Sequence, residues 1–188
     1  ENEQLSLFGT AKEPEEPLLC AALSLQGEGA AFIRFEGEEE KKHKGISSEL
    51  MWEKLRSLCG EGVCLIGFQI KDYYAYLGED VETDSLFDVL IAAYLLNPLK
   101  NDYQTEDIAA EHLGTGISSY GQLFGKKKAA EAMAEQREEF VRYLCSQADV
   151  LLRSRRVLEE KLKETEQFDL FSEIEMPLSR VLYHMEQE

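Results

Sequence analysis

The chain has 188 residues, of which 44% are hydrophobic, enough for a buried core and for one domain, or one domain and part of a second. Its 37 acidic residues outnumber the 20 lysines and arginines, and the formal net charge is −17. This balance argues against autonomous binding to nucleic acid, because contacts with phosphates need lysine and arginine. Three short basic runs, at 41–44, 125–128 and 153–156, are each flanked by acids and are interpreted as solvated faces.

Cysteine and hydropathy patterns predict a cytoplasmic protein. Cys59 and Cys64 lie close in sequence but lack the further ligands of a zinc site, so the four cysteines are interpreted as reduced, small hydrophobic residues. No apolar run reaches membrane-spanning length, and the N-terminus shows no targeting pattern. Because the sequence begins without methionine and ends within a helical pattern, we expect it to be a piece of a longer protein.

The N-terminal part of the sequence predicts strands. The apolar segments 18–25 and 30–35 are joined by the turn sequence QGEG and are typical of a β-hairpin. A shorter apolar segment, LSLF at 5–8, is expected to supply a third strand beside the hairpin.

Strands and helices are mixed in the middle of the chain. Either Ser47 or Ser48 is expected to cap a helix that continues to about residue 58, and Asp88 to cap a helix over 89–96 that Asn97-Pro98 stops. Between these helices the pattern predicts a buried strand at 63–68, a short helix at 72–78 that ends at Gly78, and a brief strand at 85–87.

The remaining sequence predicts helices alone. The segment TEDIAAEHLG is expected to form a helix with Thr105 as its N-cap and Gly114 after its end, followed by a Gly- and Ser-rich loop at 114–125. Apolar residues spaced three, four or seven apart predict one long helix from about 127 to 163. Another helix begins near 168, with Pro177 as a kink or a restart point. This order predicts an α/β domain, a mixed β-sheet flanked by helices.

The stretch YLCSQADVLL, residues 143–152, contains two polar residues whose directions can be predicted. A helix advances by about 100° per residue, so Gln147 lies about 60° from Leu144 on the buried side, whereas Asp149 lies about 140° away on the opposite face. Tyr143 is at the border of the buried side. The glutamine is therefore expected to point into the protein, and the aspartate into solvent.

Three phrases of the sequence resemble the 3′–5′ exonuclease-like domain of bacterial DNA polymerase I, a member of the A-family polymerases. FDVLIAAYLLNP at 87–98 is similar to a helix of that domain, and YLCSQADVLL resembles the helix that holds its third exonuclease motif. LFSEIEMPLSRVLYHME at 170–186 resembles the first helix of the polymerase domain and is the most specific match. The resemblance implies a ribonuclease H-like fold with a C-terminal helical extension. It divides the chain into an exonuclease-like domain at 1–164 and the start of the polymerase domain at 165–188.

Active nucleases of this superfamily hold two metal ions, roughly 4 Å apart, with four carboxylates. The resemblance places the first pair of ligands at Leu5 and Leu7, the second motif at Tyr73, and the third, Tyr-x-x-x-Asp, at Tyr143 and Gln147. All four ligand positions are thus neutral. We therefore predict that the chain has no catalytic, cofactor-binding or metal-binding residues.

Nearby acids are not expected to replace the missing ligands. Asp72 is adjacent to Tyr73, but one residue on a helix turns the side chain by about 100°. Asp149 faces the other way, and Asp88 is interpreted as an N-cap.

The resemblance implies that the parent protein is a DNA-directed DNA polymerase of replication and repair that uses Mg²⁺. This piece would be its vestigial, catalytically inactive proofreading domain with a structural role. We expect it to be monomeric and to meet DNA only through the polymerase domain. Two alternatives remain: an active metal-dependent 3′–5′ exonuclease, which the loss of carboxylates argues against, and an acidic module that binds a basic partner protein.

Overall fold

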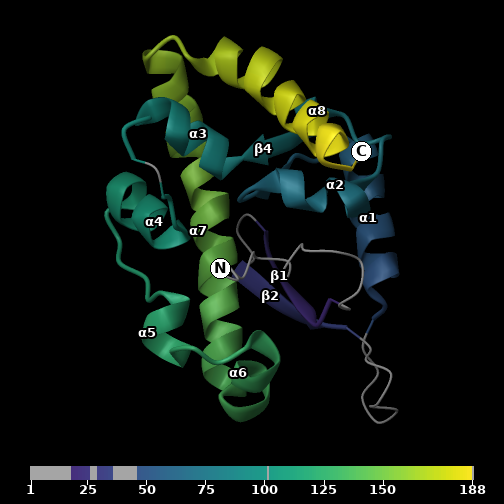
Figure 1. The fold of residues 1–188 in the computed structure, drawn as a ribbon, viewed down its shortest axis with the longest axis vertical. Helices are drawn as coiled ribbons and strands as arrows, with labels where there is room; N and C mark the ends of the chain where they lie inside the picture. Colours follow the sequence, from purple (N-terminus) through teal and green to yellow (C-terminus); the bar gives the residue numbers. More distant parts are fainter. Residues whose placement is uncertain (1–17, 26–28, 36–45, 101, 188) are drawn as a thin grey trace.

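A computed structural model describes residues 18–25, 29–35, 46–100 and 102–187, and the predicted strand at 5–8 lies outside them. The long helix α7 (Arg137–Glu164) forms the axis of the fold (Figure 1). Two small sheets and helices α3, α4 and α6 pack around it. Its buried face includes Phe140, Leu144, Leu151 and Leu158, which recur at the spacing of one helix face.

The predicted hairpin is confirmed. Strand β1 (Cys20–Leu25) pairs antiparallel with β2 (Gly29–Arg34), with Ala22 opposite Phe32. Cys20, Ala21 and Ala22 of β1 are buried, and α7 packs across both strands.

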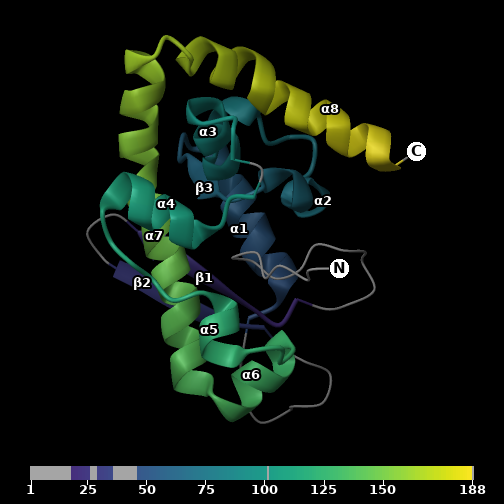
Figure 2. The same cartoon turned by 60° about the vertical axis from the view of Figure 1, so that its left-hand side comes forward.

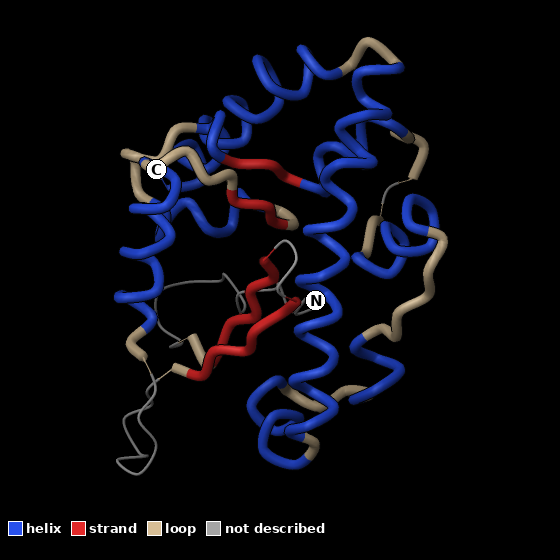
Figure 3. The backbone as a smooth tube through the Cα atoms, turned by 180° about the vertical axis from the view of Figure 1, so that it is seen from behind, coloured by secondary structure: helices blue, strands red, loops and turns tan. Residues whose placement is uncertain are grey.

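A second pair of strands lies further along α7, as the view from behind shows (Figure 3). Strand β3 (Leu65–Gly67) runs parallel to β4 (Leu86–Asp88). The strand predicted at 63–68 is therefore shorter than expected, and it is only partly buried, since Leu65 and Ile66 are half-buried. The α/β class is confirmed, with the strands of the described residues arranged as two two-stranded sheets.

Short helical segments connect β3 to β4. The 3-10 turn η1 (Ile70–Tyr73) continues into α2 (Tyr74–Leu77), which ends at Gly78 as predicted, and η2 (Thr83–Ser85) leads into β4. On the flanks, α1 (Ser48–Gly60) is capped by Ser47, whose hydroxyl accepts a hydrogen bond from Leu50 N. Helix α3 (Val89–Leu96) begins at the predicted cap, Asp88.

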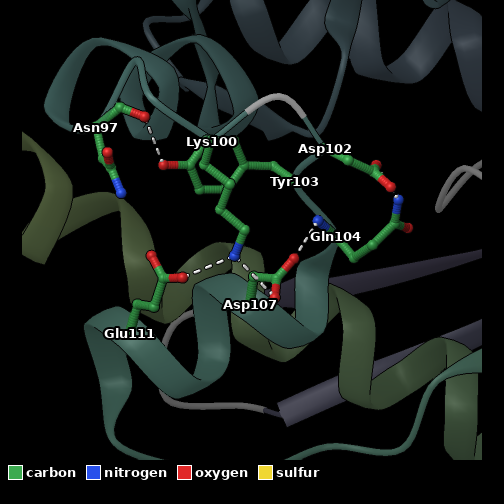
Figure 4. A network of polar contacts seen from close by, with 7 residues as sticks. All are labelled: Asn97, Lys100, Asp102, Tyr103, Gln104, Asp107 and Glu111. Carbon is green, nitrogen blue, oxygen red and sulfur yellow. Dashed lines mark hydrogen bonds and ion pairs between the residues drawn. The ribbon is translucent and has the colours of Figure 1, made fainter.

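A small polar network fixes the connection from α3 to α4 (Thr105–Leu113) (Figure 4). The Lys100 ammonium lies 2.9 Å from Asp107 Oδ1 and 2.7 Å from Glu111 Oε1. The Tyr103 hydroxyl donates to the Asn97 carbonyl at 3.0 Å, and Lys100 lies over the Tyr103 ring. The network joins the end of α3 to the first turns of α4.

Three helix predictions need correction. The N-cap of α4 is Gln104, not Thr105, because Gln104 forms a reciprocal capping box with Asp107. The segment expected to be a loop contains α5 (Tyr120–Phe124), capped by Ser119 and Gln122. The helix expected at 127–163 is two helices, α6 (Ala129–Glu135) and α7, because Gln136 leaves the helical region with φ −129° and ψ 46°.

The C-terminal helix starts with a wider turn. A π-helical turn, η3 (Leu170–Glu175), precedes α8 (Met176–Gln187), so regular α-helical bonding restarts next to Pro177. Proline has no N–H to donate, which disfavours continuous α-helical bonding through this point. Helix α8 crosses one end of the molecule above β4, η1 and α2 (Figures 1 and 2). Among the described residues, no helix is long and apolar enough to cross a membrane.

Candidate functional site

Tyr73, where the resemblance places one metal ligand, is a buried aromatic side chain. It ends the turn η1, which starts from the left-handed residue Gln69 (φ 58°, ψ 56°), and it is only 3% exposed. Its ring stacks on Trp52 of α1, with 6.1 Å between the ring centroids and 30° between the planes. The position thus belongs to the packing between η1 and α1.

Gln147, at another ligand position, points into the protein as predicted. Its side chain is 4% exposed, on the face of α7 that carries Leu144 and Leu151. The amide nitrogen Nε2 is buried and has no hydrogen-bond partner among the residues that the structure describes. A buried donor without a partner destabilises the fold, so Gln147 is a polar group that packing tolerates rather than needs.

Tyr143, one turn before Gln147, lies in an aromatic cluster. Its ring meets those of Tyr120 and Phe124 edge-on, with 5.7 Å between centroids in each pair. Burial, and then the nearby acid Glu106, raise the pKa of the Tyr143 hydroxyl above its usual range. The cluster joins α7 to α5, a contact that sequence reasoning missed because α5 was expected to be a loop.

The acids near the ligand positions have other partners. Asp149 points outward, as predicted: its side chain is 43% exposed and lies 3.4 Å from Arg153 Nη1. Asp72 Oδ2 accepts a hydrogen bond of 2.8 Å from Gln69 Nε2. Burial is the main cause that raises the pKa of Asp72, and Glu186 adds to it, while the Gln69 hydrogen bond and Lys71 oppose it.

Asp88 does more than cap α3. Its Oδ1 accepts from Leu90 N at 2.9 Å and Ile91 N at 3.4 Å, and also from Gln69 N at 3.1 Å, whereas Oδ2 accepts from Ile70 N at 2.6 Å. The side chain is 2% exposed, and burial raises its pKa to about 6. Sequence reasoning identified the cap but gave no signal for the bonds to residues 69 and 70. These bonds hold the start of η1, and therefore the placement of Tyr73.

Comparison with known proteins adds to this geometry. Residues 68–153 match the family described as "DNA polymerase I, ribonuclease H-like domain". A segment of 101 residues is 34% identical to DNA polymerase I of Bacillus subtilis (strain 168), and a similar segment is 29% identical to DNA polymerase I of Geobacillus stearothermophilus. Residues 68–153 of this chain are therefore similar to the ribonuclease H-like domain of DNA polymerase I.

The matches cover parts of both partners. They span 53% and 54% of this chain but only 11% of each relative. The family match includes Tyr73, Asp88, Tyr143 and Gln147, but not the segment 165–188. The start of a polymerase domain within 165–188 therefore stays a prediction.

Of the four positions where the resemblance expects metal ligands, the structure describes two, Tyr73 and Gln147. Leu5 and Leu7 lie outside the described residues. Tyr73 and Gln147 are both neutral and buried. The Tyr73 ring packs on Trp52, whereas the Tyr143 ring packs on Tyr120 and Phe124, so the two tyrosines belong to separate aromatic contacts. Within the described ranges, no three His, Cys, Asp or Glu side chains lie close enough together to hold a metal ion. Divalent cations such as Mg²⁺ need oxygen ligands, mostly carboxylates, which these two positions do not supply.

Proposed function

We propose that this ribonuclease H-like domain is a vestigial proofreading domain, catalytically inactive and structural, within a DNA polymerase I of replication and repair. The observation that carries the proposal is the burial of uncharged Tyr73 and Gln147 at positions where the resemblance expects carboxylates. A two-metal nuclease stabilises the attacking and leaving oxygens of the phosphodiester through ions that those carboxylates hold. Without the carboxylates, the site has no means of holding the ions.

The rest of the proposed function concerns the whole protein. The parent would use Mg²⁺ for nucleotidyl transfer in the cytoplasm, and it would contact DNA through its polymerase domain, with this domain as a packed support beside it. The net charge of −17 supports this division, since the acidic domain lacks the cationic groove that single strands need. The domain itself is proposed to be a monomer that leaves 3′ ends intact.

The deciding experiment is a nuclease assay on this chain. A 5′-labelled single strand is incubated with Mg²⁺ or Mn²⁺, and we expect no shortening beyond the protein-free control. Asp72→Asn and Asp149→Asn provide matched variants, because these are the acids nearest in sequence to the two ligand positions. Shortening that disappears in either variant would establish a live nuclease. Shortening that survives unchanged in both would identify a contaminating enzyme and leave the proposal standing.

Metal binding gives a second test that does not depend on activity. Calorimetric titration with Mn²⁺ is expected to show no saturable site of micromolar affinity. A saturable site that is lost in Asp72→Asn would contradict the proposal, because it would show that a displaced carboxylate has rescued the centre.

Binding to single-stranded DNA gives a third test. With labelled DNA at physiological salt, we expect no association in an anisotropy titration. A salt-sensitive dissociation constant in the low micromolar range would contradict the expectation, because such salt dependence is typical of phosphate contacts with a cationic surface.

A further inference from the structure

Helix α8 is held on one side by the segment that contains Tyr73. The hydroxyls of Tyr74 and Ser179 lie 2.8 Å apart, and both side chains are buried. The Arg180 guanidinium lies 4.8 Å from the centre of the Tyr74 ring, and it donates hydrogen bonds to the carbonyls of Val81 and, at 3.3 Å, Glu79. Tyr74 therefore meets α8 through both its hydroxyl and its ring face.

Contacts at the end of α8 extend the same interface. Lys71 Nζ lies 2.6 Å from Glu186 Oε1, and His184 Nε2 lies 3.4 Å from Glu79 Oε2. These pairs are exposed and contribute little to stability by themselves. Together with the buried contacts they tie residues 179–186 to the segment 71–81, which we call the platform.

The platform is tied to α1 on its other side. Tyr73 stacks on Trp52, and the Trp52 ring also stacks on Tyr76, with 5.1 Å between centroids and 10° between the planes. Arg56 Nη1 of α1 donates to the Tyr76 carbonyl at 2.5 Å. Neighbouring tyrosines thus face opposite ways, since Tyr73 meets α1 while Tyr74 meets α8.

We propose that the platform is the seat that fixes the direction of α8, and that the tyrosine at the former ligand position is part of this seat. The inference rests on the proposed structural role and names the place through which it acts. In a live nuclease, a carboxylate at residue 73 would have to face a metal ion. Here the side chain at residue 73 stacks on Trp52 and holds the platform from behind, so the requirements of a metal ligand and of the seat conflict.

Hydrogen–deuterium exchange of the 188-residue chain, read by mass spectrometry, tests the seat directly. In the double variant Tyr74→Phe, Arg180→Ala, we expect amide exchange of residues 176–187 to become at least tenfold faster, while that of residues 137–164 stays within twofold of the parent. Arg156→Ala is the control, because Arg156 is exposed and pairs with Glu160 on its own helix, α7. Unchanged exchange of α8 in the double variant would overturn the proposal.

The role of residue 73 is tested by Tyr73→Asp and Tyr73→Phe. Phenylalanine keeps the stacking on Trp52, so α8 should exchange as in the parent, whereas aspartate should speed its exchange as the double variant does. If Tyr73→Asp unfolds the whole chain, Tyr73→Ser replaces it, because serine removes the ring without adding a charge. Amide exchange of α8 should then be faster in Tyr73→Ser than in the unmutated chain. Parent-like exchange of α8 in a folded Tyr73→Ser chain would overturn the role of residue 73. Nuclease activity of the unmutated chain that is lost in Asp72→Asn or Asp149→Asn would instead overturn the proposed function and leave the exchange results unaffected.

Discussion

Asp88 and the pair Tyr73 and Gln147 give a contrast between two buried regions of one domain. Asp88 keeps its carboxylate in the core, where four backbone N–H groups donate to it. Tyr73 and Gln147 are equally buried, and both are uncharged. In the described core, a carboxylate is thus present where backbone donors surround it, while the positions expected to depend on metal ions are neutral.

The pKa of Asp88 shows how strong this constraint is. Even with four donors, burial raises the pKa to about 6 from an ordinary value of 3.8, so loss of solvation outweighs the hydrogen bonds. A carboxylate at residue 73 or 147 would have to be buried without that set of donors, and its charged form would be disfavoured further. The neutral residues remove this cost.

The largest effect is expected when carboxylates are placed at residues 73 and 147, where no set of backbone N–H donors like that of Asp88 is described. Tyr73→Asp, Gln147→Asp should lower the free energy of unfolding by about 4 kcal/mol or more in urea titrations, relative to the parent. Tyr73→Asn, Gln147→Asn is the matched control, with the same shapes and no charge, and it should lose distinctly less. Equal losses in the two variants at pH 8 would show that positions 73 and 147 are solvated. Adding Leu5→Asp and Leu7→Glu should let Mn²⁺ restore part of the stability by binding the folded state.

Removing the supported carboxylate tests the other half of the contrast. Asp88→Ala should lower the free energy of unfolding by about 3 to 4 kcal/mol at pH 5, because it removes the cap of α3 and leaves buried N–H groups without acceptors. Thermal unfolding followed by circular dichroism measures the loss. The control is Asp84→Ala: Asp84 is exposed, in the turn η2 just before β4, and its loss should change stability by less than about 0.5 kcal/mol. If Asp88→Ala loses no more stability than Asp84→Ala, other groups must accept the hydrogen bonds of the four N–H groups that now donate to Asp88.

The raised pKa of Asp88 predicts a pH dependence of known sign. Between pH 4 and pH 6 the folded state holds the Asp88 proton more tightly than the unfolded state, so stability from this group falls as the pH rises through that window. The difference between the ordinary pKa of 3.8 and the folded-state pKa of about 6 corresponds to a loss of up to about 3 kcal/mol in the free energy of unfolding across this window. Subtracting the pH profile of Asp88→Asn from that of the parent isolates the effect. A difference that rises between pH 4 and pH 6 would show that the folded pKa lies below the ordinary value.

Gln147 offers the smallest and most selective test. Because its amide nitrogen is buried without a partner in the described part of the chain, Gln147→Leu should raise the free energy of unfolding by about 1 kcal/mol. Ser154→Ala is the comparison, since buried Ser154 on the same helix donates its hydroxyl hydrogen to the Leu151 carbonyl at 3.0 Å. Ser154→Ala should bring no such gain. A loss of stability in Gln147→Leu would mean that the amide has a partner in the folded chain.

Local signals in the sequence predicted much of the fold. The hairpin, the caps at Ser47 and Asp88, and the inward direction of Gln147 follow from turn chemistry and helical periodicity, which act over a few residues. The α5 helix also had a local signal, the Ser119 to Gln122 capping box, but Gly121 has low helix propensity and the surrounding glycines favour a loop. The break at Gln136 had no such signal, because neither proline nor glycine marks it and the apolar spacing continues through it.

Contacts between distant residues could not be predicted in the same way. The bonds from Asp88 to residues 69 and 70, and the pairing of Tyr74 with Ser179, join parts of the chain 18 to 105 residues apart. No spacing rule connects such residues, since the fold alone brings them together. The sequence alone shows that the four positions are neutral, while the contacts between residues 71–81 and α8 could not be predicted from it.

The π-helical turn Leu170–Glu175 gives α8 a fixed rotational phase. Each residue in a helix turns the chain by about 100°, so one residue deleted from this turn would rotate the side chains that follow by that amount. Arg180 would then take the place of Ser179 beside Tyr74, and Val181, now 52% exposed, would move toward the place of Arg180. Composition would be almost unchanged, yet α8 would show a different surface to its surroundings. The number of residues in this turn therefore sets which side chains of α8 face Tyr74.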